Sequence, residues 1–127
     1  MAAKYPQTMR SEDVVVSTAN TGRDGSGTLA SAITGVAAGT TVRICRIAAT
    51  GNTTDGMLRF YVYDGSNNRL IDEMRVPANT PSATVRTWVA EWVPRGGEVL
   101  LPSTSHQLRI STHNAETFHV TTEGYDY

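Results

Sequence analysis

Hydrophobic and polar residues alternate along most of the chain in short stretches, which is the pattern of half-buried β-strands. The clearest stretch is 57–64, in which Leu58, Phe60 and Val62 alternate with arginine and tyrosine. Turn-forming residues follow at 64–68, and 69–76 then returns as a second apolar stretch that ends before Pro77. These two stretches predict a β-hairpin.

About eight short strands are expected along the chain, separated by loops rich in Gly, Asn, Asp, Ser and Pro. The clear ones span 13–19, 41–49, 57–64, 69–76, 83–93, 98–101, 107–112 and 117–122, and the last two are expected to form a hairpin. Residues 29–39 are ambiguous, because their alanines allow a short helix while β-branched residues between glycines favour an irregular strand, which we prefer.

This spacing of strands predicts an all-β protein with an antiparallel β-sandwich or jelly-roll-like fold. We expect one domain over residues 13–127, because no segment repeats and no linker divides the chain. Residues 1–12 show no periodicity and contain Pro6, so they are expected to form an extended N-terminal arm.

Two of the expected strands carry apolar residues in both phases. Within 41–49, Val42 and Ile44 share one phase while Cys45 and Ile47 share the other, which predicts a β-bulge near Cys45 and Arg46. Within 83–93, three valines (85, 89 and 93) alternate with Trp88 and Trp92. Bulky side chains on both faces predict that one face is buried and the other contacts a partner.

Composition and charge exclude several classes of protein. The 127 residues carry 11 Lys and Arg against 12 Asp and Glu, so the formal charge is −1 and gives no electrostatic reason to expect nucleic-acid binding. Nothing approaches the ~18 consecutive apolar residues of a membrane helix. Cys45 is the single cysteine, which excludes an intrachain disulfide and favours a buried structural thiol. The first residues lack the apolar core of a signal peptide, so we expect synthesis in a cytoplasm.

No arrangement of residues predicts catalysis, a metal site or a cofactor. Ser105 and His106 are adjacent, but a catalytic triad depends on geometry and the chain has no G-x-S-x-G motif. His113 and His119 flank the expected last hairpin and would supply two ligands, whereas zinc needs three or four.

The arginines are more informative, because the chain has ten of them and a single lysine, Lys4. Arg, Trp and Tyr are enriched in protein interfaces, in which Lys is depleted. One interpretation is an ordinary polar sheet face, and the other is a contact between subunits. The second interpretation predicts that these residues contact another subunit or a capsid: Tyr5, Arg43, Arg59, Arg86, Trp88, Trp92, Tyr125 and Tyr127.

From about Gly39 onward, four segments share a pattern with known proteins: 41–65, 69–82, 100–103 and 108–127. Three of their pieces occur in order, namely Leu-Pro-Ser at 101–103, Ser-Thr-x-Asn-Ala-Glu at 111–116 and Glu-Gly-x-Asp-Tyr at 123–127. With this pattern the chain resembles small virion proteins of tailed phages or prophages, mostly uncharacterised, which are encoded near capsid and head–tail genes. The resemblance implies a β-sandwich structural subunit without enzymatic activity, and it supplies no catalytic residues.

Two hypotheses for function follow. The first is a homo-oligomeric virion component, assembled in the bacterial host cytoplasm, that binds major capsid or head–tail proteins and neither nucleic acid nor membrane. It would serve as a capsid decoration or as a head-associated subunit in a spike base or neck. The alternative is a carbohydrate-binding β-sandwich for host attachment, in which Trp88, Trp92 or the tyrosines stack on sugar rings and Asn and Asp in the loops bond the sugar hydroxyls.

Overall fold

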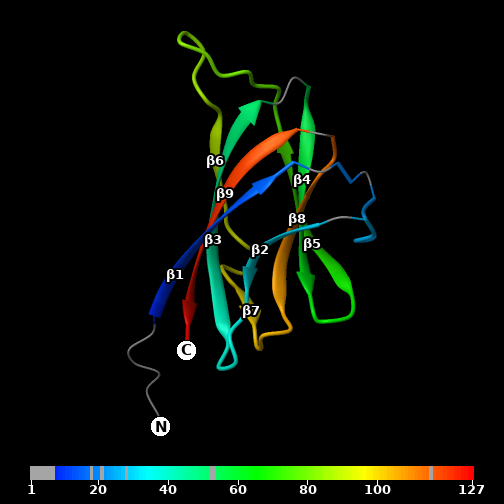
Figure 1. Ribbon diagram of the computed structural model, residues 1–127, viewed down its shortest axis with the longest axis vertical. Coiled ribbons are helices and arrows are strands. Elements are labelled where there is room, and N and C mark those ends of the chain that lie inside the picture. The colour runs from blue at the N-terminus through cyan, green and yellow to red at the C-terminus, as the bar shows by residue number, and fades with distance from the viewer. Residues whose placement is uncertain (1–7, 18, 21, 28, 52–53, 115) are drawn as a thin grey trace.

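The computed structural model describes residues 8–127 apart from 18, 21, 28, 52, 53 and 115. The described residues fold without a helix into nine strands, which all pair antiparallel (Figure 1). The strands are β1 (Thr8–Val16), β2 (Ala30–Thr34), β3 (Thr40–Gly51), β4 (Gly56–Tyr63), β5 (Asn68–Val76), β6 (Val89–Trp92), β7 (Val99–Leu101), β8 (Gln107–Thr112) and β9 (Thr117–Asp126).

The strands form two sheets, which we call sheet A and sheet B. Sheet A has the order β1-β9-β3-β6, and β7 also pairs with β3. Because β6 pairs with residues 45–48 of β3 and β7 with residues 40–42, these two short strands occupy one position in the sheet. Sheet B has the order β2-β8-β4-β5.

These orders are those of a jelly roll, with eight strand positions in two sheets. From β1 to β4 and again from β5 to β9 the chain passes from one sheet to the other, while the β4–β5 hairpin stays in sheet B. The expected fold class is therefore confirmed, as are the hairpin over 57–76 and a strand within 29–39.

The core lies between the sheets and is built from the inward phase of each strand. Its centre contains Phe60 of β4 and Trp92 of β6, whose rings stack with centroids 3.9 Å apart and planes inclined by 3°. The Trp92 indole N–H donates a hydrogen bond of 2.8 Å to Asp72 on β5. One aromatic pair and one hydrogen bond thus join the two sheets.

Two strand boundaries differ from expectation. The first strand begins at Thr8, so residues 8–12 of the expected arm pair with β9, while residues 1–7 lie outside the described residues. The expected strand 83–93 is wrong over its first half, because only Val89–Trp92 pairs with β3. Asn79 accepts a hydrogen bond from the Trp88 backbone, and Ser82 caps the N–H groups of Thr84 and Val85. These side-chain bonds favour a loop over a strand.

The bulge and the last hairpin are also corrected. In the pairing of β3 with β9 the register shifts between Val42 and Ile44, which places the extra residue at Arg43 instead of near Cys45 and Arg46. The expected hairpin of 107–112 and 117–122 does not form, because β8 lies in sheet B and β9 in sheet A. Residues 113–116 therefore cross from one sheet to the other.

Candidate protein interface on the outer face of sheet A

The outer face of sheet A is ordered in rows by the pairing registers, because directly paired residues point to the same side of a sheet. One row contains Met9, Tyr125, Thr41 and Leu100. A second contains Ser11, Glu123 and Ile44, a third contains Asp13, Thr121, Arg46 and Glu91, and a fourth contains Val15, His119, Ala48 and Val89. The second and third rows carry the charged residues and are together called the central row, which thus lies between two rows that carry apolar side chains.

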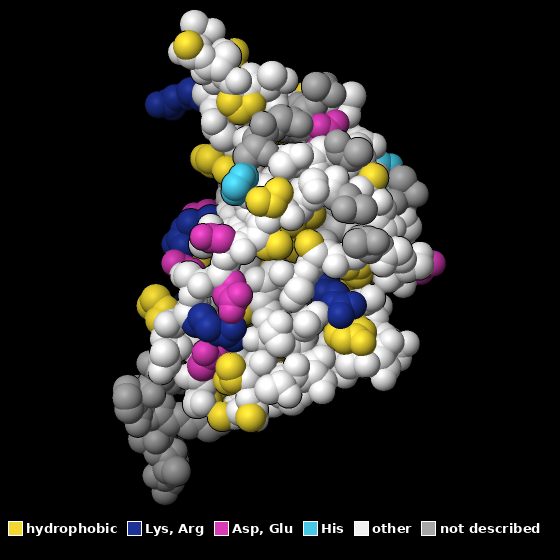
Figure 2. All heavy atoms as spheres, in the orientation of Figure 1, with side chains coloured by type: hydrophobic (Ala, Val, Ile, Leu, Met, Phe, Trp, Pro, Cys, Tyr) yellow, Lys and Arg dark blue, Asp and Glu magenta, His cyan; other side chains and the backbone are white. Residues whose placement is uncertain are grey.

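The apolar residues of the outer rows are strongly exposed. Met9 is 61% exposed, Val15 49%, Val89 68% and Leu100 60%. Figure 2 shows hydrophobic side chains interspersed with acidic and basic ones on the left of the view, the side on which sheet A lies in Figure 1. Large apolar side chains gathered on one face are typical of an interaction site, whereas isolated ones are ordinary.

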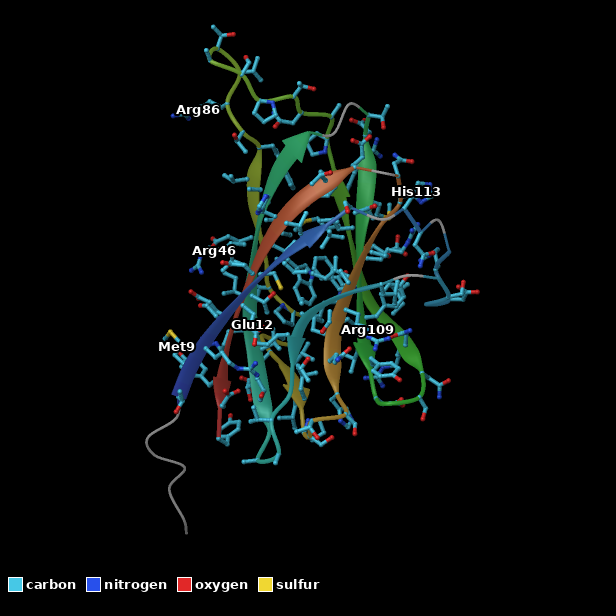
Figure 3. All side chains as sticks on the ribbon, in the orientation of Figure 1. Met9, Glu12, Arg46, Arg86, Arg109 and His113 are labelled. Atoms are coloured by element: carbon cyan, nitrogen blue, oxygen red, sulfur yellow. The ribbon has the colours of Figure 1, made fainter. Side chains whose placement is uncertain are left out.

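The central row is held by ion pairs around Arg46, whose side chain points outward from β3 (Figure 3). Its Nη1 lies 2.7 Å from Glu123 Oε1 and its Nε 3.4 Å from Glu91 Oε2. The hydrogen bond with Glu123 raises the pKa of Arg46. Surface pairs of this kind contribute about 0–1 kcal/mol, so their main effect is to order the side chains of three neighbouring strands.

The shallow hollows on this face include two next to Arg46 and Arg43. One, of about 540 Å³, is lined by Ala48, Val89 and His119 together with the Arg46–Glu91 pair. The other, of about 260 Å³, is lined by residues that include Met9, Arg43, Ile44 and Tyr125. The bulge at Arg43 places its guanidinium carbon 5.5 Å from the centre of the Tyr125 ring. The structure therefore brings together two residues that the sequence marked separately.

Around Arg59 and Tyr61, the outer face of sheet B is covered instead by the chain segment after β1, whereas Ser31 on the same face is exposed. Arg59 is 4% exposed and donates hydrogen bonds to the Asn20 carbonyl (3.3 Å) and to His113 Nδ1 (3.2 Å). Tyr61 is fully buried, and its hydroxyl donates to the Gly22 carbonyl (3.1 Å). The prediction that Arg59 contacts a partner is thus wrong, because its guanidinium ties the segment around Asn20 to the sheet.

The two tryptophans also differ from the prediction. Trp92 is 4% exposed and belongs to the core, so its assignment to an interface is wrong. Trp88 is half-buried and packs against the same core. Arg86 is exposed in the loop before β6, where its side chain points away from the sandwich (Figure 3).

Two further predicted residues belong to β9 and the chain end that follows it. Tyr125 lies on the outer face of sheet A, and Tyr127 is 37% exposed with its hydroxyl 2.9 Å from Thr41 Oγ1. Tyr5 lies outside the described residues. The sequence reading missed Met9, Val15 and Leu100, and it passed over Val89 in favour of the tryptophans. The alternation of valines with tryptophans in 83–93 was the signal that could have identified Val89 as an outward residue.

The remaining titratable groups serve the fold. Burial raises the pKa of the Cys45 thiol to about 11, although the hydrogen bond with Thr122 opposes this effect. Burial would also raise the pKa of Asp72, but its bonds with Trp92, the Glu73 backbone and Arg95 together hold it below the ordinary value.

Among the described residues, no three His, Cys, Asp or Glu side chains come together in a way that could hold a metal ion. His106 Nδ1 lies 2.8 Å from Ser103 Oγ, so the hydroxyl beside it is not that of Ser105. The part of the chain that the structure describes contains no helix with the length and apolarity needed to span a membrane.

Comparisons with known proteins gave the following. No protein-family model matches the chain, and no curated protein matches it. Similar solved structures include a pentameric capsid protein isolated from metagenomic phage sequences, with 12% identity and a TM-score of 0.42 over 98% of this chain. They also include chains of the T13 IBDV viral particle and of the infectious bursal disease virus Gt strain, each with 10% identity and a TM-score of 0.43, over 95% and 97% of this chain. The chain spans 62%, 31% and 34% of the length of these three chains, respectively.

Proposed function

We propose that this chain is a non-enzymatic structural subunit of a phage virion, a capsid decoration or head-associated protein that binds the particle through protein–protein contacts. The observation that carries the proposal is the outer face of sheet A, on which four large apolar side chains are 49–68% exposed. The resemblance of residues 39–127 to small phage virion proteins supports the same function.

The fold by itself leaves several functions open, because jelly rolls occur in capsid proteins, lectins and cupins. The surface favours one of them. A sheet face that meets only water usually carries polar side chains, whereas here apolar rows flank an ordered charged row. That arrangement fits an interface with an apolar centre and fixed polar contacts.

The charges on this face define the partner surface further. Three acidic side chains, Asp13, Glu91 and Glu123, lie there with two basic ones, Arg43 and Arg46. A partner surface with exposed apolar residues and a small excess of basic charge would complement it. We propose that the partner with this complementary surface is a major capsid or head–tail protein.

The positions of the two tryptophans remove most of the support for the carbohydrate-binding alternative. It relied mainly on exposed tryptophan rings for stacking on sugars, but Trp92 stacks on Phe60 inside the core and Trp88 packs against that core. The exposed face of sheet A offers valine, leucine and methionine in their place, which suit a protein surface better than a sugar ring.

Rebinding to phage particles tests the proposal. The purified chain should co-sediment with particles that lack it, and Val89→Glu should abolish this binding because it buries a charge in the contact. Ser31→Glu is the matched control, since Ser31 is exposed on a strand of sheet B. If the wild-type chain fails to co-sediment, or if both variants bind as well as wild type, the proposal is wrong.

A further inference from the structure

The sandwich has four edge positions, and three of them are interrupted. In β2 the register with β8 shifts between Ser31 and Ile33, and in β5 it shifts opposite Phe60 and Tyr61. At the third edge, β6 and β7 are separate segments of four and three residues. The fourth edge, β1, pairs with β9 over nine residues with no shift of register.

Uninterrupted edges are uncommon in monomeric proteins, which protect them with bulges, short strands, proline or charged side chains. The β1 strand is long and has no bulge, proline or lysine; it carries three charged residues, Arg10, Glu12 and Asp13, and six of its nine residues are exposed. It lies on the near side of sheet A in Figure 1, and Figure 3 shows Met9 and Glu12 along it. Among the described residues, the edge of β1 is therefore the longest uninterrupted template for pairing with another strand.

We infer that β1 pairs antiparallel with β1 of a second copy, so that the two A sheets join across a two-fold axis. This inference rests on the proposed function and deepens it, because it names a contact between copies of the proposed virion subunit. Two-fold contacts of a surface with itself are the commonest way in which identical chains associate.

The charges of β1 favour a second copy as the occupant and specify the register. Ser11 is uncharged, and it is flanked by Arg10 and Glu12, which both lie on the opposite side of the strand from it. Within one chain Arg10 already forms ion pairs with Glu12 (2.6 Å) and Asp126 (2.9 Å). With Ser11 on the axis, each Arg10 also lies opposite Glu12 of the partner strand, so two further pairs of opposite charge face each other across the contact. An axis at Arg10, Glu12 or Asp13 would instead place identical charges opposite each other.

Joining the sheets at this edge would also extend the outer face. Met9 and Val15 project from β1 on the same side as Val89 and Leu100 on the far edge of sheet A. The dimer would therefore present two such faces side by side, and both would be open to the particle. Contact between copies and contact with the particle would then use different parts of sheet A.

Disulfide trapping with Ser11→Cys tests this register. Opposite residues in an antiparallel pair have Cα atoms about 4.5–5.5 Å apart, which suits a disulfide. Mild oxidation should convert most of this variant into a covalent dimer, while Ser31→Cys on β2 should remain monomeric. The native Cys45 is fully buried and should not interfere. If Ser11→Cys cross-links no faster than Ser31→Cys, the inference is overturned.

Sedimentation velocity provides the second measurement. The wild-type chain should sediment as a dimer, and Ser11→Lys should sediment as a monomer because it places two ammonium groups on the axis. Leu100→Lys changes the same outer face at its other edge and should stay dimeric. A monomeric wild-type chain, or dissociation by Leu100→Lys with Ser11→Lys unaffected, contradicts the pairing.

The same variants separate this inference from the proposed function. A monomeric chain that still co-sediments with particles would overturn the β1 pairing and leave the proposed function standing. A stable β1 dimer that does not bind particles would support the β1 pairing and overturn the proposed function. If Ser11→Lys abolishes particle binding while the wild-type chain is monomeric, the β1 edge binds a strand of a different protein and the self-pairing is wrong.

Discussion

The outer faces of the two sheets have opposite characters, although the sequence gives them similar patterns. Sheet B places Arg59 and Tyr61 on its outer side, and both are buried and hydrogen-bonded to the backbone carbonyls of Asn20 and Gly22. Sheet A leaves Val89 and Leu100 exposed on its outer side, with no described segment of the chain over them. The phase of a residue in a strand therefore says which way it points, whereas the rest of the fold decides whether it is covered.

The largest effect should come from the covered face. Arg59→Ala removes a buried guanidinium and its two hydrogen bonds, to the Asn20 carbonyl and to His113, so we expect a loss of about 3–5 kcal/mol of unfolding free energy. Arg46→Ala, on the bare face, should cost about 0–1 kcal/mol. Urea titration measures both, and equal losses would contradict the difference between the faces.

The next largest effect is a dependence of stability on pH caused by Cys45, which lies on the inner side of β3, whereas Arg46 lies on the outer side of the same strand. Because burial raises the pKa of Cys45 to about 11, the folded chain holds the thiol proton more tightly than the unfolded chain does. This contribution to stability is complete below pH 9, the ordinary thiol value, and is lost as the pH rises from 9 to 11.

A shift of this size corresponds to about 3 kcal/mol of unfolding free energy. Chemical denaturation between pH 8 and 11 should show it as a steeper decline for wild type than for Cys45→Ala, which lacks the titrating group. Parallel declines would show that burial does not raise the pKa of Cys45 in the folded chain.

A matched pair of glycines isolates the packing of the covering segment. Gly25 and Gly96 both have positive φ, at 79° and 83°. A Cβ at Gly25 would lie 2.6 Å from Asn68 Cβ, whereas nothing lies within 4 Å of one at Gly96. Both alanine variants carry the backbone strain of ~1 kcal/mol, and Gly25→Ala should lose ~1–3 kcal/mol more through the clash.

Thermal unfolding of the two variants measures that difference. It should appear as a lower Tm for Gly25→Ala than for Gly96→Ala. Equal Tm values would mean that the backbone around Gly25 moves to accommodate the added Cβ, so that this segment is not tightly packed against Asn68.

The smallest effect on stability should come from the bare face. Val89→Ser and Leu100→Ser change residues that are 68% and 60% exposed, so each should alter the unfolding free energy by less than about 0.5 kcal/mol. Their association with particles should nevertheless fall. A loss of several kcal/mol in the isolated chain would show that these side chains support the fold instead of a contact.

Local pattern was sufficient for much of the architecture. Alternation identified the inward residues Leu58, Phe60 and Val62, and the turn residues after Asp64 identified the hairpin between β4 and β5. These features depend on neighbours in sequence. They were therefore accessible without knowledge of the rest of the fold.

Features that depend on distant residues were not accessible in the same way. In 83–93 both the valine and the tryptophan phases are apolar, and only the stacking of Trp92 on Phe60 decides which is inward. The short connection 113–116 looks like a hairpin turn, but it joins strands of different sheets. Arg59 was assigned to a surface because the segment that covers it lies some forty residues earlier in the chain.

A cryo-electron microscopy map of phage particles carrying this protein tests the central claim most directly. The account predicts jelly-roll density whose contacts with neighbouring protein are made through the outer face of sheet A, with Val89 and Leu100 inside the contact. A map in which this face meets solvent while sheet B or the loops hold the subunit, or in which the protein is missing from the particle, would contradict it.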